Sequence, residues 1–365
     1  MRLRLACVVL SAVVLAPGPI AYATGQAATA DTLPARLSDE DFWQLSTALS
    51  EPGGYFRSDN LVSNELWFQW VIPNLVARAG TGGVYVGVGP EQNFTYVAAL
   101  RPKMVFITDV RRGNLHTHLM YKALFELSAD RAGFISRLFT KARPQGLSDA
   151  SGAADLMNAY WDVLTSTEQV YRENLKAIQD HLTRTRRLPL SAEDLMGIET
   201  VYYNFYWFGP SITYSSSTGG SRGFQTTFYD LMVATDNAGV ARSFLASEES
   251  FRVIKDLHQR NLVVPVVGNF AGPTALRAVG DYVRGRGGTI TAYYLSNVEQ
   301  YLYQDGIWQR FCANVATLPL DDRSTFIRST QGGGGGRGLV NSLASIKTEV
   351  RSCGGQAPPP DVESQ

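Results

Sequence analysis

Apolar residues recur along the chain either at helical spacing or in short continuous runs, and the changes between these two patterns predict its helices and strands. Ser38 opens a capping sequence (SDED) just before a run of apolar residues, which predicts a helix start. Near-helical spacing over 65–78 predicts a second helix, with a kink expected at Pro73. Short apolar runs then alternate with helical spacing. They predict strands over 84–86, 103–109, 262–267 and 289–295, and helices over 93–100, 114–127, 238–258 and 274–284.

This alternation of strand, turn and helix is typical of βαβ units in a parallel sheet. Two further extended runs, 308–318 and 324–328, are expected to close the sheet. Residues 130–200 have helical character and are expected to form an insertion or cap, and spacing over 339–350 predicts a C-terminal helix. The predicted fold is α/β and Rossmann-like, with a mostly parallel sheet, helices on both faces and a helical insertion.

The remaining segments are classified by their composition. Small and polar residues over 24–37 predict a disordered lead-in, so that the α/β domain is expected to occupy 38–330. The glycine run at 332–336 is interpreted as a hinge within a C-terminal part, 331–365, that ends in a tail. Aromatic residues crowd into 201–229, which we interpret as core and lid, with a stacking platform as the alternative.

The first 23 residues have the pattern of a cleavable signal peptide. Arg2 and Arg4 precede an uncharged run over 5–16, and Ala21-Tyr22-Ala23 supplies the small-x-small motif, so cleavage is expected before Thr24. The run of twelve residues is shorter than the roughly 20 that a membrane span needs. The alternative is an N-terminal membrane anchor. We expect an exported protein, periplasmic or secreted, with no stable membrane span after processing.

Charge and cysteine content narrow the functional classes. Removing residues 1–23 leaves 31 basic and 33 acidic residues, and this balance argues against a nucleic-acid partner. Cys312 and Cys353 are the cysteines left after processing. In an oxidising compartment they could pair, which would stabilise the fold by roughly 4 kcal/mol, or they could stay as two free thiols. The cysteines form no CxxC motif or cluster with histidine, and we expect no metal site.

The strongest chemical pattern joins the first two predicted strands. Gly87-Val88-Gly89 ends the first strand and Asp109 ends the second, 20 residues further on. Glycines let a backbone approach a ligand closely, and an acid at this distance is placed to accept hydrogen bonds from ribose hydroxyls. We expect the Asp109 carboxylate to lie at the carboxyl edge of the sheet and to serve a ligand more than the fold. The alternative is a tight turn in which Asp109 only caps the segment leading to Asn114.

These residues carry a resemblance to a known fold. The chain from Val84 to Asp109, with later strands over 262–295, resembles the class I S-adenosylmethionine-dependent methyltransferases. More closely, GVGPEQNFTY at 87–96 and DVRRGNL at 109–115 resemble a family of uncharacterised bacterial proteins of that fold. The resemblance implies an S-adenosylmethionine cofactor, with Gly87 and Gly89 along its methionine part and Asp109 on its ribose.

The chain departs from the methyltransferase pattern at two positions. Such enzymes usually carry an acid two residues before the first glycine, where this chain has Tyr85, and a third glycine where it has Glu91. We include Glu91 and Asn93, from the turn after the first strand, among the candidate cofactor-binding residues. We also include Arg111, which follows the second strand and is placed to meet an anionic ligand group; the alternative for Arg111 is a surface ion pair.

Residues after later strands complete the candidate site. Asn269 and Phe270 follow the strand over 262–267, at the edge where open α/β sheets bind ligands, and Tyr214 belongs to the aromatic stretch. We assign these three to the substrate side. His116 and His118 lie two apart on a predicted helix, so we expect hydrogen-bonded or solvated roles rather than metal ligation.

Three functional hypotheses follow. The first is transfer of a methyl group from S-adenosylmethionine to an unknown small molecule. The second is a non-catalytic envelope protein that uses the same crevice for a nucleoside-like or anionic ligand, which Tyr85, Glu91 and the signal peptide favour. The third is an interaction scaffold.

Overall fold

The computed structural model describes residues 32–219, 225–331, 339–351 and 353. The predicted signal peptide over 1–23 and the predicted glycine hinge over 332–336 lie outside the described residues. Of the predicted lead-in, residues 32–37 are described. They form neither helix nor strand, but they pack on the domain, because Leu37 is buried and its backbone N–H donates to the carbonyl of Arg260 at 3.0 Å.

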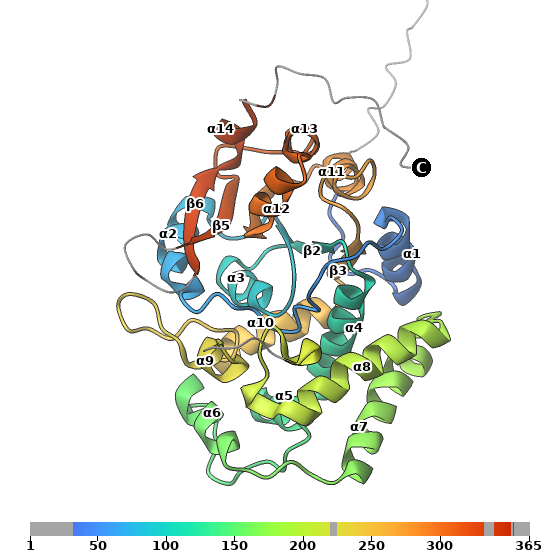
Figure 1. The fold of residues 1–365 in the computed structure, drawn as a ribbon, viewed down its shortest axis with the longest axis vertical. Helices are drawn as coiled ribbons and strands as arrows, with labels where there is room; N and C mark the ends of the chain where they lie inside the picture. The colour runs from blue at the N-terminus through green and yellow to red at the C-terminus, as the bar shows by residue number, and fades with distance from the viewer. Residues whose placement is uncertain (1–31, 220–224, 332–338, 352, 354–365) are drawn as a thin grey trace, which may run out of the picture. The chain divides into compact units, whose positions relative to one another are not determined.

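A single sheet organises the domain (Figure 1). In the described residues its strand order is β3-β2-β1-β4-β5-β6, with β5 and β6 antiparallel and every other neighbouring pair parallel. The strands are β1 (Val84–Gly87), β2 (Met104–Asp109), β3 (Val263–Val267), β4 (Ile290–Ser296), β5 (Thr325–Gln331) and β6 (Leu339–Ser345). The predicted α/β fold with a mostly parallel sheet is therefore confirmed.

The burial of the strands explains their sequences. Every residue of β1, β2 and β3 is buried, which fits the uninterrupted apolar runs of parallel strands that are covered on both faces. Pro265 cannot donate a ladder hydrogen bond, and β3 accommodates it because it is an edge strand. The free edge of β3 is in turn covered, since the backbone N–H of Glu51 donates to the carbonyl of Val267 at 2.7 Å.

Helices cover both faces because the crossovers run in opposite directions along the sheet. α3 connects β1 to β2, whereas α11 lies on the path from β3 back to β4, and right-handed crossovers of opposite direction place their helices on opposite faces. α3 packs with α2 and α10, and α11 packs with α1 and α13. These helices are α1 (Asp39–Leu49), α2 (Ile72–Ala79), α3 (Gln92–Leu100), α4 (Arg112–Leu127), α10 (Glu248–Gln259), α11 (Ala275–Gly285), α12 (Val298–Gln304), α13 (Trp308–Ala316) and α14 (Ile346–Arg351).

Between α4 and α10 the chain forms the helical insertion, which fills the lower part of Figure 1. A buried ion pair ties it to the domain: Arg131 Nε and Glu248 Oε1 are 2.9 Å apart. Its helices are α5 (Arg131–Leu138), α6 (Ala153–Trp161), α7 (Glu168–Asp180), α8 (Ala192–Phe208) and α9 (Phe228–Val233). Single helical turns also occur, namely η1 (Phe68–Val71), η2 (His181–Thr185), η3 (Gly209–Ser211) and η4 (Ser216–Thr218).

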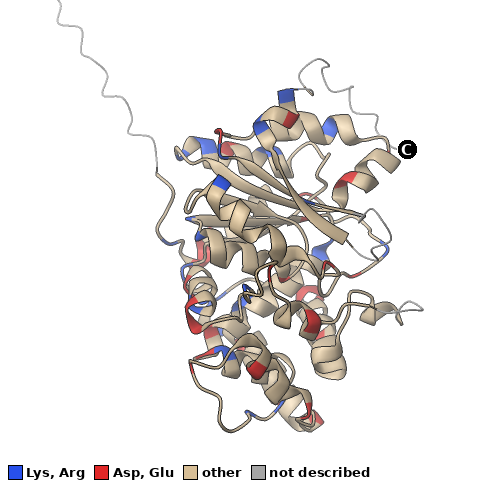
Figure 2. Cartoon of the chain, turned by 90° about the vertical axis from the view of Figure 1, so that its left-hand side faces the viewer, with Lys and Arg blue, Asp and Glu red and all other residues tan. Residues whose placement is uncertain are grey.

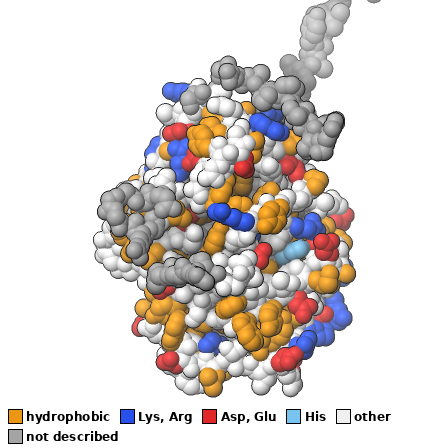
Figure 3. All heavy atoms as spheres, in the orientation of Figure 1, with side chains coloured by type: hydrophobic (Ala, Val, Ile, Leu, Met, Phe, Trp, Pro, Cys, Tyr) orange, Lys and Arg blue, Asp and Glu red, His pale blue; other side chains and the backbone are white. Residues whose placement is uncertain are grey.

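The aromatic stretch divides between core and surface. Tyr202, Phe205 and Phe228 are fully buried, as expected of core residues. Tyr203 and Trp207 are 45% and 65% exposed on α8, and their rings stack at 6.0 Å. Figure 3 shows hydrophobic side chains gathered on the lower part of this face, over the insertion.

Two predicted elements near the C-terminus are wrong, and each has a physical reason. Residues 308–316 of the predicted strand over 308–318 form helix α13, because Phe311, Cys312 and Val315 are buried at helical spacing. Of the predicted helix over 339–350, residues 339–345 form strand β6, because Leu339 and Asn341 are buried while Val340 points outward. The remaining residues, 346–350, are helical and belong to α14. Since β6 pairs with β5, the sheet extends beyond the predicted domain end at 330.

Two predicted helices are shorter than expected. Over 65–78 the chain turns through η1 first and α2 begins only at Ile72, so Pro73 lies in the first helical turn and causes no kink. Over 238–258 the helix α10 begins at Glu248, where the Ser247 side chain accepts a hydrogen bond from Ser250 N.

Cys312 and Cys353 form a disulfide, with their Cα atoms 5.7 Å apart. Structural disulfides are typical of proteins outside the cytoplasm. No helix in the described ranges is long and apolar enough to cross a membrane. In the view of Figure 2, basic and acidic residues are interspersed, in keeping with a formal net charge of zero.

Candidate functional site

A cavity of about 540 Å³ opens at the carboxyl ends of the parallel strands. Its walls include residues that follow β1 (Gly89), β2 (Asp109), β3 (Phe270) and β4 (Asn297). The chain runs from β1 to β2 in one direction along the sheet and from β4 to β5 in the other, so the cavity lies at the topological switch point between β1 and β4. Open α/β sheets bind their ligands at this position.

The turn after β1 is held from behind by Asn93. Its amide nitrogen Nδ2 donates to the carbonyl oxygens of Val88 and Pro90, at 2.9 and 2.7 Å, and its Oδ1 accepts from the Tyr85 hydroxyl at 2.9 Å. Gly89 has a φ of +75° and open space where a side chain would begin. Gly89 therefore faces the cavity, whereas Gly87 and Asn93, both predicted cofactor contacts, lie beneath the turn and do not line it.

Glu91 also lies behind the turn rather than in the cavity. Its Oε1 accepts from the backbone N–H of Ser63 at 3.0 Å, and its Oε2 has no hydrogen-bond partner in the part of the chain that is described. Burial raises the pKa of the Glu91 carboxyl to about 7. Its position indicates a structural role, in which it holds the segment over 61–64 against the turn.

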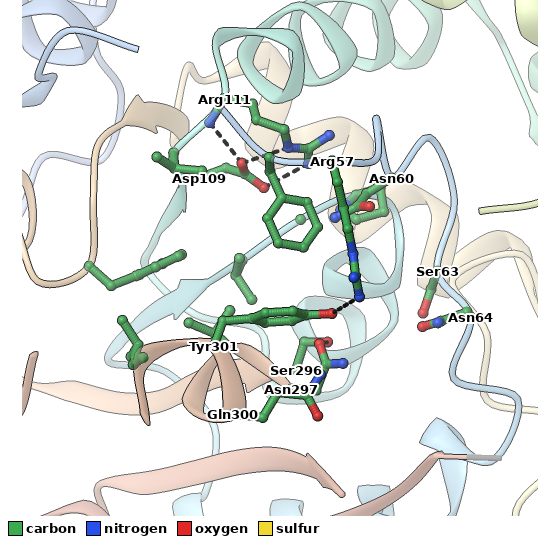
Figure 4. A pocket seen from close by; sticks show the side chains of 18 of the residues that line it. Arg57, Asn60, Ser63, Asn64, Asp109, Arg111, Ser296, Asn297, Gln300 and Tyr301 are labelled. Carbon is green, nitrogen blue, oxygen red and sulfur yellow. Dashed lines mark hydrogen bonds and ion pairs between the residues drawn. The ribbon is translucent and has the colours of Figure 1, made fainter. Parts of the chain in front are cut away.

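Asp109 lies at the cavity wall, as predicted, but Arg111 already occupies most of its carboxylate (Figure 4). Oδ1 accepts from the backbone N–H and from Nε of Arg111, at 2.9 and 3.1 Å, and Oδ2 accepts from Nη2 at 2.9 Å. Both side chains are under 10% exposed. A carboxylate offers about four acceptor sites, so roughly one of them is left for a ligand.

Arg111 completes a clamp with its remaining nitrogen. Nη1 donates to the carbonyl of Ser58 at 3.0 Å and also to the carbonyl of Asp59. The pair of Asp109 and Arg111 thus fixes the loop over 51–64 across the edge of the sheet. The sequence did not predict this role of Arg111 in the fold, although Arg111 also lines the cavity as a candidate cofactor contact would.

The three predicted substrate-side residues all line the cavity. Phe270 is 7% exposed, and its carbonyl accepts from the Asn314 amide at 2.9 Å. Asn269 uses its own Oδ1 to accept from Ala271 N at 2.9 Å. Burial raises the pKa of the Tyr214 hydroxyl, which keeps it protonated. The structure therefore brings together Gly89, Asp109, Arg111, Tyr214, Asn269 and Phe270 from the predicted site.

Sequence reasoning missed two contributors to the cavity. The first is the loop that carries Arg57, Asn60 and Asn64, which comes from a turn-rich segment before the first strand. The second is the start of α12, with Asn297 and Tyr301. The position of Asn297, two residues after the predicted strand over 289–295, was a usable signal, because the carboxyl-edge rule applies to β4 as it does to β1.

A buried acid supports the floor of the cavity. Glu65 is fully buried, and its Oε1 accepts from the hydroxyls of Tyr294 and Ser296, the first at 2.8 Å and the second at 2.5 Å. Its Oε2 accepts from the amides of Gln92 and Asn341, each at 2.8 Å. Ser296 has a φ of +51°, a strained conformation that this network holds in place.

The two neighbouring histidines serve different elements. His118 Nε2 lies 2.8 Å from the carbonyl oxygen of Gly89, and burial lowers its pKa to about 4, so the neutral ring donates there. His116 Nε2 lies 3.0 Å from Asp194 Oδ1, which ties α4 to α8. No group of three or more His, Cys, Asp or Glu side chains suited to a metal ion occurs in the described residues.

Comparison with known families gives a match that covers most of the chain. The model of a domain of unknown function (DUF7790) matches residues 60–195 and 216–345, so the chain belongs to that family. No curated protein matches the chain.

Proposed function

We propose that this member of the DUF7790 family binds a nucleoside-containing small molecule in the cavity at the carboxyl edge. The cofactor we propose is S-adenosylmethionine, and the reaction is transfer of its methyl group to a second small molecule. The observation that carries the proposal is the position of the cavity at the switch point between β1 and β4. The resemblance of 87–96 and 109–115 to methyltransferase-like proteins supplies the cofactor class.

The cavity residues fit such a cofactor in part. Gly89 leaves open space at the wall, so a ligand can approach its backbone. Asp109 can accept about one hydrogen bond from a ribose hydroxyl beyond those from Arg111. Phe270 and Tyr214 provide aromatic surface that can pack on the ligand and exclude water. S-adenosylmethionine itself would supply the activated methyl group.

A second candidate is ligand binding without catalysis, and the chemistry of the walls favours it. The described lining residues include no histidine, cysteine or lysine, and the Asp109 carboxylate is engaged by Arg111. Asp305, at an exposed position, is the other lining carboxylate. A reaction that needs a buried general base therefore has few groups to use, whereas a reversible binder needs none.

For its location, we propose a periplasmic or secreted protein released by cleavage of the signal peptide. The disulfide between Cys312 and Cys353 supports a location outside the cytoplasm. An exported enzyme has no obvious supply of S-adenosylmethionine, and this too favours the second candidate.

Calorimetric titration with S-adenosylmethionine, S-adenosylhomocysteine and adenosine tests the proposal. Gly89→Ala, which adds a methyl group at the cavity wall, should weaken binding at least about tenfold. Gly239→Ala is the matched control, because Gly239 has nearly the same φ (+76° against +75°), the same open surroundings and a position outside the cavity lining.

The outcomes separate the two candidates. If none of the three ligands binds, the methyltransferase proposal fails. Binding that Gly89→Ala and Gly239→Ala weaken equally would place the ligand elsewhere. Binding in the cavity without any methyl transfer to a metabolite extract would support the second candidate.

A further inference from the structure

Arg57 brings to the cavity a positive charge that no carboxylate among the described residues neutralises. It comes from the loop over 51–64, and its Nη2 donates to the hydroxyl of Tyr301 at 3.2 Å (Figure 4). The guanidinium carbon also lies 5.6 Å from the centre of the Tyr301 ring. Arg57 is exposed, and within the described ranges no carboxylate forms an ion pair with it and no protein acceptor contacts its other four N–H donors.

The other charged residues that line the cavity are Arg111, Asp109 and Asp305, and none of them is as available to a ligand anion as Arg57. Arg111 is neutralised by Asp109, and its remaining nitrogen, Nη1, donates to backbone carbonyls. Asp305 is exposed and makes no ion pair with Arg57 in the described structure. Arg57 is therefore the group in this cavity best able to gain a charged partner from a ligand.

Amide side chains surround the same part of the cavity. Asn64, Asn297 and Gln300 line it and are drawn in Figure 4 on the side of the Arg57 tip that faces away from Asp109. None of these three amide nitrogens donates to a protein acceptor among the described residues. A planar guanidinium fork with amide N–H groups nearby can present several donors to the oxygens of an anion.

The aromatic neighbours of Arg57 hold it in place and form an apolar wall. Phe56 meets the Tyr301 ring edge to face, with ring centres 5.1 Å apart. The ring of Tyr301 thus contacts both Phe56 and the Arg57 guanidinium. A ligand that reaches Arg57 passes along this wall, so an apolar body next to its charge would also be accommodated.

We propose that Arg57 and the neighbouring amides bind the anionic group, carboxylate or phosphate, of an organic molecule with an apolar body. This second ligand is the methyl acceptor if the protein is a transferase, and it is the bound solute if it is not. The inference rests on the proposed function for its location in the ligand cavity. It adds the chemical class of the molecule that is recognised there.

Paired probes of equal shape test the charge. Benzoate and benzamide differ mainly in charge, and calorimetry should show that the full-length processed protein binds benzoate at least about tenfold more tightly. Arg57→Gln should abolish this preference, and Arg57→Lys should keep part of it, because a point charge replaces the fork. Arg252→Gln is the matched control, since Arg252 is an exposed arginine on α10 outside the cavity lining and should leave the preference unchanged. Phenyl phosphate in place of benzoate distinguishes a phosphate from a carboxylate ligand.

The results that overturn the inference are distinct from those that overturn the proposed function. Equal affinity for benzoate and benzamide, a preference that survives Arg57→Gln, or no binding of any probe would refute the anion site. S-adenosylhomocysteine titrated into the same proteins reports on the nucleoside ligand. If S-adenosylhomocysteine binds but benzoate and benzamide bind equally, the proposed function stands and the anion site is refuted. If benzoate is preferred but S-adenosylhomocysteine does not bind, the anion site stands and the proposed nucleoside ligand is refuted.

Discussion

Replacing Asp109 by asparagine tests whether this residue serves the ligand or the fold. The substitution keeps the shape of the side chain and removes its charge. In the protein that charge faces Arg111, whose side chain is 9% exposed and donates to both carboxylate oxygens. The amide nitrogen of an asparagine would instead oppose one of the arginine donors. The sequence alone predicts little change in stability, whereas the structure predicts a substantial loss.

The expected magnitude follows from the burial of the pair. Removing one partner of a buried ion pair costs about 3–5 kcal/mol, because the other charge stays buried without compensation. Arg111 keeps its hydrogen bonds to the carbonyls of Ser58 and Asp59, so we expect the lower end, about 3 kcal/mol. In a domain of this size such a loss lowers Tm by about 5 °C or more.

Differential scanning fluorimetry and urea denaturation measure the change. Asp305→Asn is the control, because Asp305 lines the same cavity but is exposed and makes no ion pair in the described structure; its Tm should shift by less than about 1 °C. A double-mutant cycle with Arg111→Met should return a coupling energy above about 1 kcal/mol. A Tm for Asp109→Asn within 1 °C of the parent would refute the clamp, and it would restore the view of Asp109 as a free ligand-binding edge carboxylate.

Three further predictions follow from other parts of the chain. The folded-state pKa of Glu91, about 7, exceeds that of an unfolded glutamate, so the free energy of unfolding should fall as pH rises from about 4.5 to 7. Urea denaturation should show that, between pH 4 and pH 8, the free energy of unfolding of Glu91→Gln rises by roughly 3 kcal/mol relative to that of the parent. Replacing Cys312 and Cys353 by serine should cost roughly 4 kcal/mol, and the parent should show no free thiol among these two when denatured without reductant. N-terminal sequencing of the exported protein should begin at or near Thr24, and an intact Met1 in a cytoplasmic fraction would contradict export.

The sheet was predictable because its signal is local. Each of β1 to β4 is a short apolar run next to a helical pattern, and burial on both faces makes the run uninterrupted. The order of these strands also gives the edge at which a ligand cavity belongs, since the turns that follow them all reach that edge. Gly89, Asp109 and Phe270 could therefore be assigned to one site without knowledge of a single contact.

The C-terminal part was not predictable in the same way. Strand β6 is half polar, and only its partner β5 decides which of its residues are buried. Helix α13 is short and its apolar residues lie close together in sequence, so a brief extended run and a buried helical face gave the same signal. In both cases tertiary contact selects between two patterns that the local sequence allows.

Within the site, the sequence predicts where a side chain lies but not which groups it contacts. Topology places the Asp109 carboxylate at the sheet edge, but whether it is free depends on the rotamer of Arg111 and on the path of the loop over 51–64. That loop lies far from β2 in sequence, so no local pattern reports that its carbonyls complete the clamp. The same loop carries Arg57, which has no carboxylate partner among the described residues. Two arginines at one cavity thus have opposite roles: Arg111 closes the protein on itself, and Arg57 leaves a charge for a ligand to meet.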